Sequence, residues 1–232
     1  MLWYESFDRL RSQRLRVLSD EPMSRHTTFR IGGPARRMAF PETESELAAL
    51  LDLAAREGYP YTVIGNGSNV LSPDEGLDRL VINTSRVDTV TVVGNAVHAL
   101  AGATMARVAN AAQRAGLTGM EFAHGIPGTL GGGVFMNAGA YGGELCQVVR
   151  SVRAWFPGEG IVTLMGGECR FGYRHSVFSE KPGVVLFVEM ELTAGDSAAI
   201  KAKMEELAAR RRSSQPLELP SAGSTFKRPE GY

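Results

Sequence analysis

The pentapeptide Gly65-Asn66-Gly67-Ser68-Asn69 is the first segment of the chain whose residue types suggest chemistry. It directly follows a short strand that the sequence predicts at 61–64. Glycine adopts positive φ easily, so consecutive backbone N–H groups can converge on an anion such as a diphosphate. The serine and asparagine side chains add donors. An ordinary tight turn has the same composition. The segment matches neither GxGxxG nor the P-loop pattern, so the usual Rossmann and P-loop explanations fail.

A second, longer segment is also rich in glycine and poor in charge. It comprises Gly125, Ile126, Pro127, Gly128, Thr129, Leu130, Gly131, Gly132 and Gly133, and it continues with Met136-Asn137-Ala138-Gly139-Ala140-Tyr141-Gly142. Small residues allow the backbone to pack flat against a large planar ligand, with its N–H groups available to phosphates or ring heteroatoms. A structural crossing between two sheets is the alternative. Two separated glycine-rich segments in one chain favour a dinucleotide, which has a long footprint.

Two more segments carry a polar residue that could act on a substrate. Arg174 is flanked by aromatic and apolar residues in YRHSVF at 173–178, and a partly buried arginine usually has an anionic partner. A structural ion pair would explain it equally. Ser224 follows a glycine in AGSTFKRP at 222–229, where its hydroxyl has room for a ligand. A turn or helix-capping serine is the alternative, and the absence of GxSxG argues against a serine hydrolase.

Hydrophobic periodicity and turn residues predict the elements that position these segments. Thr43 and Glu46 match a capping box at the start of a helix over 43–56. With strands at 61–64 and 80–82, this helix indicates an α/β lobe over 25–85. The remaining predicted elements are a lead-in helix within 1–24, a hairpin of 89–93 with 96–100, helices at 104–115 and 198–212, and strands at 152–156, 161–164 and 184–192.

Composition excludes several classes of protein. The chain has 232 residues, 44% of them apolar, and its 25 Lys and Arg residues balance 25 Asp and Glu residues. This balance gives no reason to expect nucleic acid or an anionic membrane as a partner. Cys146 and Cys169 form no CxxC motif and the four histidines are scattered, so neither a disulfide framework nor a metal site is expected. We expect a soluble, cytoplasmic, monomeric protein, because no apolar run approaches a membrane span.

The order and spacing of these segments resemble the UDP-N-acetylenolpyruvoylglucosamine reductases. The resemblance covers 27–232 and rests on GNGSN at 65–69, GIPGTLGG at 125–132, MNAGAYGG at 136–143, YRHSVF at 173–178 and AGSTFKRP at 222–229. Each piece alone is a weak signal, but the ordered set is highly specific. It implies an α+β protein with the two-lobed FAD-binding fold of the vanillyl-alcohol oxidase type and a separate α/β substrate-binding domain.

The resemblance also implies a reaction and roles for named residues. The reaction is the NADPH-dependent, FAD-mediated reduction of UDP-N-acetylglucosamine enolpyruvate to UDP-N-acetylmuramate, with the FAD bound non-covalently. Arg174 matches the arginine that stabilises the charge developing on the substrate, and Ser224 matches the proton donor. The implied FAD-binding residues are Gly65, Asn66, Gly67, Ser68, Asn69, Gly125, Ile126, Pro127, Gly128, Thr129, Gly131 and Gly132. The implied substrate-binding residues are Tyr173, Arg174, Asn137 and Lys227.

The chain departs from the family pattern at its C-terminal end. Family members continue well past the GSTFKRP segment and carry, in that continuation, a glutamate that works with the arginine. We therefore expect 1–24 to be a lead-in helix, 25–85 and 86–195 to be the two FAD-binding lobes, and 196–232 to begin a truncated substrate-binding domain. The alternatives are an FAD-binding module without turnover, another oxidase or dehydrogenase on the same fold, and a sugar-nucleotide-binding protein without flavin.

Overall fold

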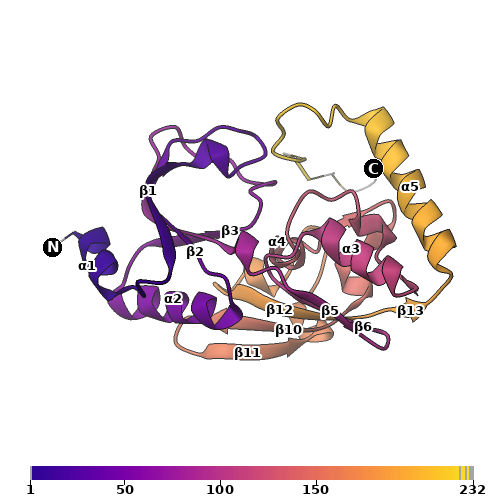
Figure 1. The fold of residues 1–232 in the computed structure, drawn as a ribbon, viewed down its shortest axis with the longest axis horizontal. Coiled ribbons are helices and arrows are strands. Elements are labelled where there is room, and N and C mark those ends of the chain that lie inside the picture. Colours follow the sequence, from indigo (N-terminus) through magenta and orange to yellow (C-terminus); the bar gives the residue numbers. More distant parts are fainter. Residues whose placement is uncertain (1, 225, 228, 230–232) are drawn as a thin grey trace.

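The computed structural model describes residues 2–224, 226, 227 and 229. Its N-terminal lobe is a four-stranded sheet in the order β1-β2-β4-β3, flanked by two helices (Figure 1). Strands β2, β4 and β3 run parallel, and β1 pairs antiparallel with β2. The elements are α1 (Trp3–Leu10), β1 (Arg16–Pro22), β2 (Pro34–Phe40), α2 (Glu44–Glu57), β3 (Tyr61–Ile64) and β4 (Leu77–Asn83).

Helix α2 begins and ends where the sequence predicts. The Thr43 hydroxyl accepts a hydrogen bond from the Glu46 N–H at 3.1 Å, and Gly58 closes the helix in the left-handed conformation with φ of 69°. One face of the helix carries Leu47 and Leu51, which are fully buried against Leu80 of β4. This packing fixes the strand β3, and therefore the turn that follows it.

The second lobe is a five-stranded antiparallel sheet in the order β11-β10-β12-β6-β5. Figure 1 shows helices α3 and α4 above this sheet and α5 beside α3, at the right-hand edge of the molecule. The predicted hairpin turns at Gly94, whose φ is 57°. The lobe comprises β5 (Val90–Val93), β6 (Ala96–Leu100), α3 (Met105–Arg114), β7 (Leu117–Thr118), α4 (Leu130–Phe135), β8 (Gly139–Ala140), β9 (Gly143–Glu144), β10 (Val149–Phe156), β11 (Gly160–Met165), β12 (Val184–Glu191), β13 (Thr193–Ala194) and α5 (Ser197–Ser214).

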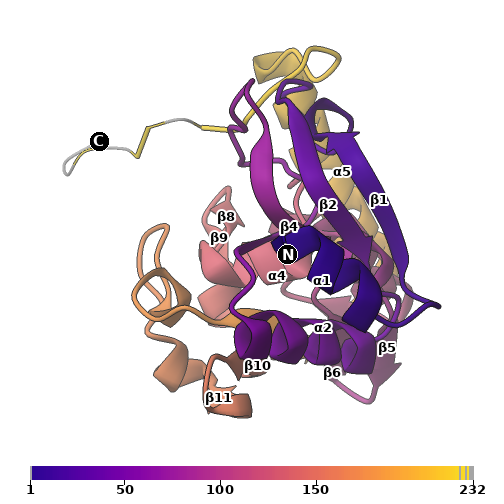
Figure 2. The ribbon, with the colours of Figure 1, turned by 90° about the vertical axis from the view of Figure 1, so that its left-hand side faces the viewer.

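The two lobes share a core. Trp155 of β10 and Leu186 of β12 are buried among the apolar residues of the first lobe. Figures 1 and 2 show α2 lying beside the sheet that contains these strands. The Trp155 indole N–H donates to Asp52 at 2.6 Å. Arg153 makes two hydrogen bonds of 2.5 Å to Glu44, and these bonds raise the pKa of Arg153. The shared core holds the lobes in a fixed relation, so loops from both can build one site.

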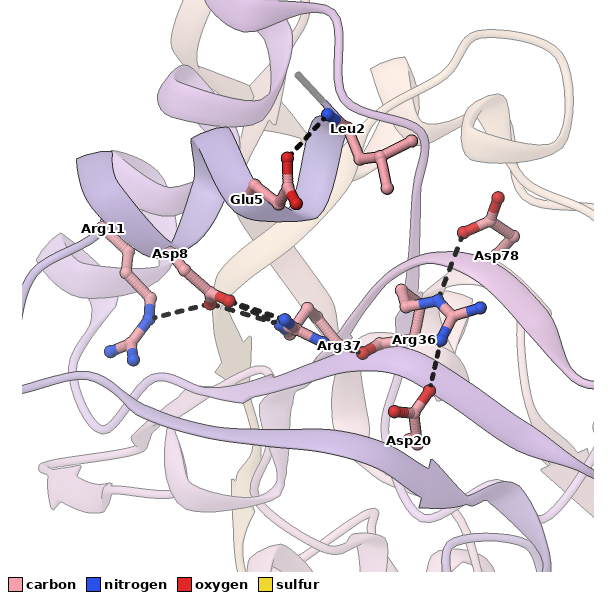
Figure 3. A network of polar contacts seen from close by, with 8 residues as sticks. All are labelled: Leu2, Glu5, Asp8, Arg11, Asp20, Arg36, Arg37 and Asp78. Carbon is pink, nitrogen blue, oxygen red and sulfur yellow. Dashed lines mark hydrogen bonds and ion pairs between the residues drawn. The ribbon is translucent and has the colours of Figure 1, made fainter.

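The predicted lead-in helix over 1–24 is wrong in its extent. Among the described residues of 1–24, the only α-helix is α1; β1 is an edge strand of the first sheet, and a short 3-10 helix, Met23–Arg25, follows it. The half-exposed sequence of β1 has no clear alternation, which hid the strand. Figure 3 shows how α1 is fixed on the first sheet: Asp8 of α1 accepts a 2.6 Å hydrogen bond from Arg37 of β2. Asp8 also pairs with Arg11 at 3.4 Å. The neighbouring Arg36 pairs with Asp20 at 2.8 Å. The first lobe therefore begins at α1.

The predicted boundary at 195/196 is also corrected by the packing. Helix α5 starts at the predicted cap, where Asp196 accepts from the Ala199 N–H at 2.7 Å. Its buried residues Ile200 and Met204 belong to the core of the second lobe, so α5 is part of that lobe. An amphipathic helix shows that one face is buried but not which domain buries it. Among the described residues, no helix is both long and apolar enough to cross a membrane.

Candidate functional site

The two glycine-rich segments meet where the two lobes join. The Asn66 amide donates to the Pro127 carbonyl at 3.1 Å. A Cβ atom added to Gly65 would lie 2.0 Å from the Thr129 hydroxyl, and one added to Gly128 would lie 3.2 Å from the Ser68 hydroxyl. We call the junction of 65–69 with 125–132 the nucleotide junction. Its backbones approach so closely because both contributing segments are rich in glycine.

The turn 65–69 presents unpaired backbone donors at this junction. Within the described part of the chain, the N–H groups of Asn66, Gly67, Ser68 and Asn69 have no protein acceptor. Gly67 has φ of 60°, and a Cβ atom there would lie 2.2 Å from the His26 carbonyl oxygen, so only glycine fits. Neighbouring N–H groups around a left-handed residue form an anion-binding concavity. The junction therefore fits the diphosphate of a dinucleotide.

Arg174 sits in a tight hairpin with a strained backbone. Gly172 and His175 exchange two backbone hydrogen bonds of 3.1 and 3.2 Å, and Arg174 between them has φ of 53°. The guanidinium lies 5.1 Å from the centre of the exposed Tyr173 ring. It donates to the carbonyl oxygens of Asn137 at 3.4 Å and of Gly139 at 2.9 Å. Neutral carbonyls leave its charge available to an anionic ligand.

Asn137 ties this hairpin to the segment 139–146. It is 1% exposed, and its amide nitrogen donates at 3.0 Å both to the Gly172 carbonyl and to the Glu144 carboxylate. Its amide oxygen accepts from the Cys146 N–H at 2.9 Å. These contacts use both N–H donors of the amide and one acceptor site of its oxygen, and the residue holds φ of 41°. Asn137 is therefore placed to position Arg174, whose guanidinium also binds the Asn137 main chain.

The histidine beside Arg174 has a structural contact. His175 Nε2 lies 2.9 Å from Glu180, which also pairs with Arg170 at 2.5 Å. Among the described residues, no group of three or more His, Cys, Asp or Glu side chains could hold a metal ion.

Ser224 and Lys227 lie on the tail that follows α5, and both are exposed. Ser221 is held at the first lobe: its carbonyl accepts from the Thr28 hydroxyl at 2.5 Å, and its N–H donates to the Thr28 carbonyl at 3.0 Å. Gly223 lies against the nucleotide junction, where an added Cβ would be 3.3 Å from the Ser68 carbonyl oxygen. Among the described residues, no hydrogen bond joins Ser224 to Arg174. Thr225 and Arg228 lie outside the described residues.

Sequence reasoning missed two residues that build the site. Thr28 connects the tail to the turn 65–69, since its own N–H donates to the Gly67 carbonyl at 3.2 Å. Glu144 accepts from Asn137 and lies within hydrogen-bonding range of the Cys146 thiol at 3.7 Å. Glu144 directly follows the MNAGAYGG motif at 136–143, so its nearness to that motif was a usable signal. The contacts themselves join distant parts of the chain and leave no trace in local sequence.

The chain matches a family model described as an FAD binding domain over residues 35–165. This match covers both glycine-rich segments, so the chain carries an FAD-binding domain, and its α+β fold is of that type. An alkyldihydroxyacetonephosphate synthase structure shares the fold, with a TM-score of 0.61 at 17% identity over 82% of this chain and 40% of that one. The class is thus that of FAD-binding proteins with this α+β fold.

More similar proteins narrow the class to one family. UDP-N-acetylenolpyruvoylglucosamine reductases from Clostridium perfringens and Caldanaerobacter subterraneus are each 46% identical to the chain, over 93% and 92% of it and 71% and 70% of the relatives. The crystal structure of the UDP-N-acetylenolpyruvylglucosamine reductase from Thermus caldophilus has a TM-score of 0.78 at 33% identity, covering 94% of this chain and 76% of that one. The chain belongs to the UDP-N-acetylenolpyruvoylglucosamine reductase family.

Proposed function

We propose that the chain catalyses the NADPH-dependent reduction of UDP-N-acetylglucosamine enolpyruvate to UDP-N-acetylmuramate, a step in peptidoglycan precursor synthesis. The proposal is carried by the nucleotide junction, whose backbone N–H groups have no acceptor among the described residues, in a member of this reductase family. Arg174, in addition, has no carboxylate partner among the described residues and donates only to backbone carbonyls. The nucleotide junction would hold FAD, which would supply the chemistry of hydride transfer between NADPH and the β-carbon of the enolpyruvyl group.

Arg174 supplies electrostatic stabilisation in this proposal. Hydride addition to the β-carbon leaves negative charge on the α-carbon and the neighbouring carboxylate, and a positioned guanidinium stabilises that charge. Asn137 orients Arg174 by binding the Gly172 carbonyl with its side chain and the guanidinium with its main chain. Tyr173 lies beside the guanidinium and contributes an exposed ring to the substrate side.

Ser224 supplies the proton. A serine hydroxyl is a weak acid, but a carbanion next to a carboxylate is a far stronger base, so the transfer to the α-carbon is downhill. Lys227, three residues further along the tail, offers a cation to the substrate diphosphate. We also propose that the chain acts as a monomer on small molecules in the cytoplasm.

A second candidate function is FAD binding without turnover. It is favoured by one observation: Ser221 and Gly223 hold the tail at Thr28 and Ser68 in the first lobe, while Arg174 lies in the second lobe. Under this second hypothesis, the FAD-binding part of the chain is complete, but the hydroxyl of Ser224 does not reach the substrate.

Anaerobic spectroscopy distinguishes the two candidates. The protein is loaded with FAD, bleached with one equivalent of NADPH, and then mixed with UDP-N-acetylglucosamine enolpyruvate. Return of the yellow absorbance only after the substrate is added supports the reductase. A flavin that bleaches but ignores the substrate supports FAD binding without turnover. A flavin that NADPH does not bleach, while dithionite does, contradicts the proposed hydride donor.

A further inference from the structure

The inward face of helix α5 ends in an arginine beside the nucleotide junction. Ile200, Met204 and Leu207 are the buried residues of α5, and Arg211 follows Leu207 at the helical spacing of four. Arg211 is half-buried, whereas Arg212 is exposed. Figure 1 shows the end of α5 at the point where the tail crosses toward the first lobe. An arginine on the inward face of a helix needs a reason, because partial burial of a cation costs free energy.

Arg211 has no anionic partner to offset this cost. Among the described residues, no carboxylate pairs with Arg211. The neighbouring Arg210, by contrast, lies 3.9 Å from the Glu206 carboxylate and over the ring of Tyr141. The aliphatic part of Arg211 packs on the junction instead, since its Cδ would lie 3.2 Å from a Cβ added to Gly125. A cation in the last turn of a helix is stabilised by the helix dipole, but this does not explain why Arg211 is half-buried. Arg212 has the same stabilisation while its side chain is exposed to solvent.

The junction itself lacks a cation. The segments 65–69 and 125–132 contain no charged residue, yet a diphosphate brings two negative charges. Gly125, against which Arg211 packs, begins the segment whose Pro127 carbonyl is bound by Asn66. Arg211 is thus a half-buried cation, without a carboxylate partner among the described residues, that packs on one of the two segments of the junction. A guanidinium suits a diphosphate because it donates several hydrogen bonds in a fixed fork.

We propose that Arg211 binds the diphosphate of FAD at the nucleotide junction. The proposal rests on the FAD site described above and adds a side-chain cation to its backbone donors. It assigns α5 a role in cofactor binding, as well as in the core of the second lobe.

The test is the dissociation constant for FAD, measured by flavin fluorescence on apo-protein at low and high salt. We expect Arg211→Ala and Arg211→Gln to weaken FAD binding about tenfold to a hundredfold and to reduce its salt dependence. Arg211→Gln keeps most of the stem that packs on Gly125, so it separates lost charge from lost packing. Arg212→Ala, on the same helix turn, should stay within about twofold of the unsubstituted protein. Riboflavin, which has no phosphate, should bind all variants equally.

Three results would overturn the proposal. Equal FAD affinity in both Arg211 variants and the unsubstituted protein would leave Arg211 without a role. A loss with Arg30→Ala instead, in the segment next to Thr28, would assign the cation to the first lobe. Weaker binding of UDP but not of FAD would assign Arg211 to the substrate diphosphate. Absence of FAD binding by the folded, unsubstituted protein would be the separate failure of the FAD site. Thermal unfolding of each apo variant verifies that it folds.

Discussion

The nucleotide junction and the catalytic segments differ in how they are held. The first loop of the junction follows β3, whose Tyr61 and Val63 pack on the shared core, and the second loop follows Phe122 and Ala123, which are buried in the core of the second lobe. The two loops contact each other through Asn66, Gly65 and Thr129. Arg174 is held within the second lobe through Asn137. Ser224 lies on an exposed tail whose nearest hydrogen-bonded anchor is Ser221 on Thr28.

The nucleotide junction is therefore a preformed site, whereas the catalytic site must close to bring Ser224 to the substrate. FAD binding needs backbone N–H groups already in place, which the core provides. Proton transfer needs a hydroxyl within hydrogen-bonding reach of the substrate, and apo geometry often lacks such contacts. We therefore expect changes at the junction to abolish FAD binding, and changes at Asn137 or Thr28 to alter turnover while FAD remains bound.

The largest expected effect is from Gly67→Ala. A left-handed alanine costs about 1 kcal/mol, and the new Cβ would lie 2.2 Å from the His26 carbonyl oxygen, so the turn must move. We expect FAD affinity to fall at least about a hundredfold in a titration followed by flavin fluorescence. Gly94→Ala is the matched control, because Gly94 has a similar φ of 57° and nothing within 4 Å of its added Cβ. Normal FAD affinity in Gly67→Ala would refute the preformed turn.

Asn137→Ala should lower kcat about a hundredfold while FAD affinity stays nearly unchanged. The amide holds the Gly172 carbonyl, and without it the hairpin that carries Arg174 loses its anchor. A double-mutant cycle with Arg174→Ala gives the sharper measurement. If Asn137 acts through Arg174, the double variant is hardly slower than Arg174→Ala alone. Additive losses would show an independent role for Asn137, such as direct substrate contact.

Thr28→Val should have a smaller effect, confined to the tail. It removes the hydrogen bond to the Ser221 carbonyl but keeps the shape of the side chain and the Thr28 backbone contacts. We expect trypsin to cleave after Lys227, on the tail, about threefold faster, because the tail opens more often. FAD affinity should change less than twofold or so. Thr91→Val, an exposed threonine on β5, controls for the loss of a hydroxyl.

The smallest effect concerns the N-terminal helix, far from either site. Burial raises the pKa of Asp8, but the hydrogen bonds and charges of Arg37 and Arg11 outweigh it, so the pKa lies below its usual value. A depressed carboxyl pKa adds stability above the unfolded-state pKa, and this stability is lost as the pH falls through the folded-state pKa. Asp8→Asn should cost roughly 0.5 kcal/mol at neutral pH. The difference should shrink below about pH 4 in denaturant melts. A constant difference across this pH range would contradict the ion pair with Arg37.

The sequence predicted most elements because their signals are local. The Thr43 cap, the Gly94 turn and the strand before Gly65 all follow from residue types within a few positions. Helix α4 inside the second glycine-rich segment escaped prediction, because glycine disfavours helices and only tertiary contacts support this one. Leu130 and Gly131, for example, donate to the carbonyls of Ala103 and Ala101 at 2.8 Å.

The candidate site was predicted in its parts but not in its connections. The motifs marked the glycine-rich segments, Arg174 and Ser224, whereas the link from Thr28 to Ser221 spans 193 positions. The approach of Arg211 to Gly125 likewise depends on which lobe buries α5. Periodicity reveals a buried face but carries no information about its partner, so such contacts require the folded structure.

The most direct test of the account is a titration of FAD into the purified apo-protein. We predict saturable binding of one FAD per chain, with the flavin released unchanged when the protein is precipitated with acid, as expected for non-covalent attachment. A folded protein that shows no saturable binding, or a flavin that stays attached after denaturation, would contradict the assignment of the nucleotide junction as a non-covalent FAD site.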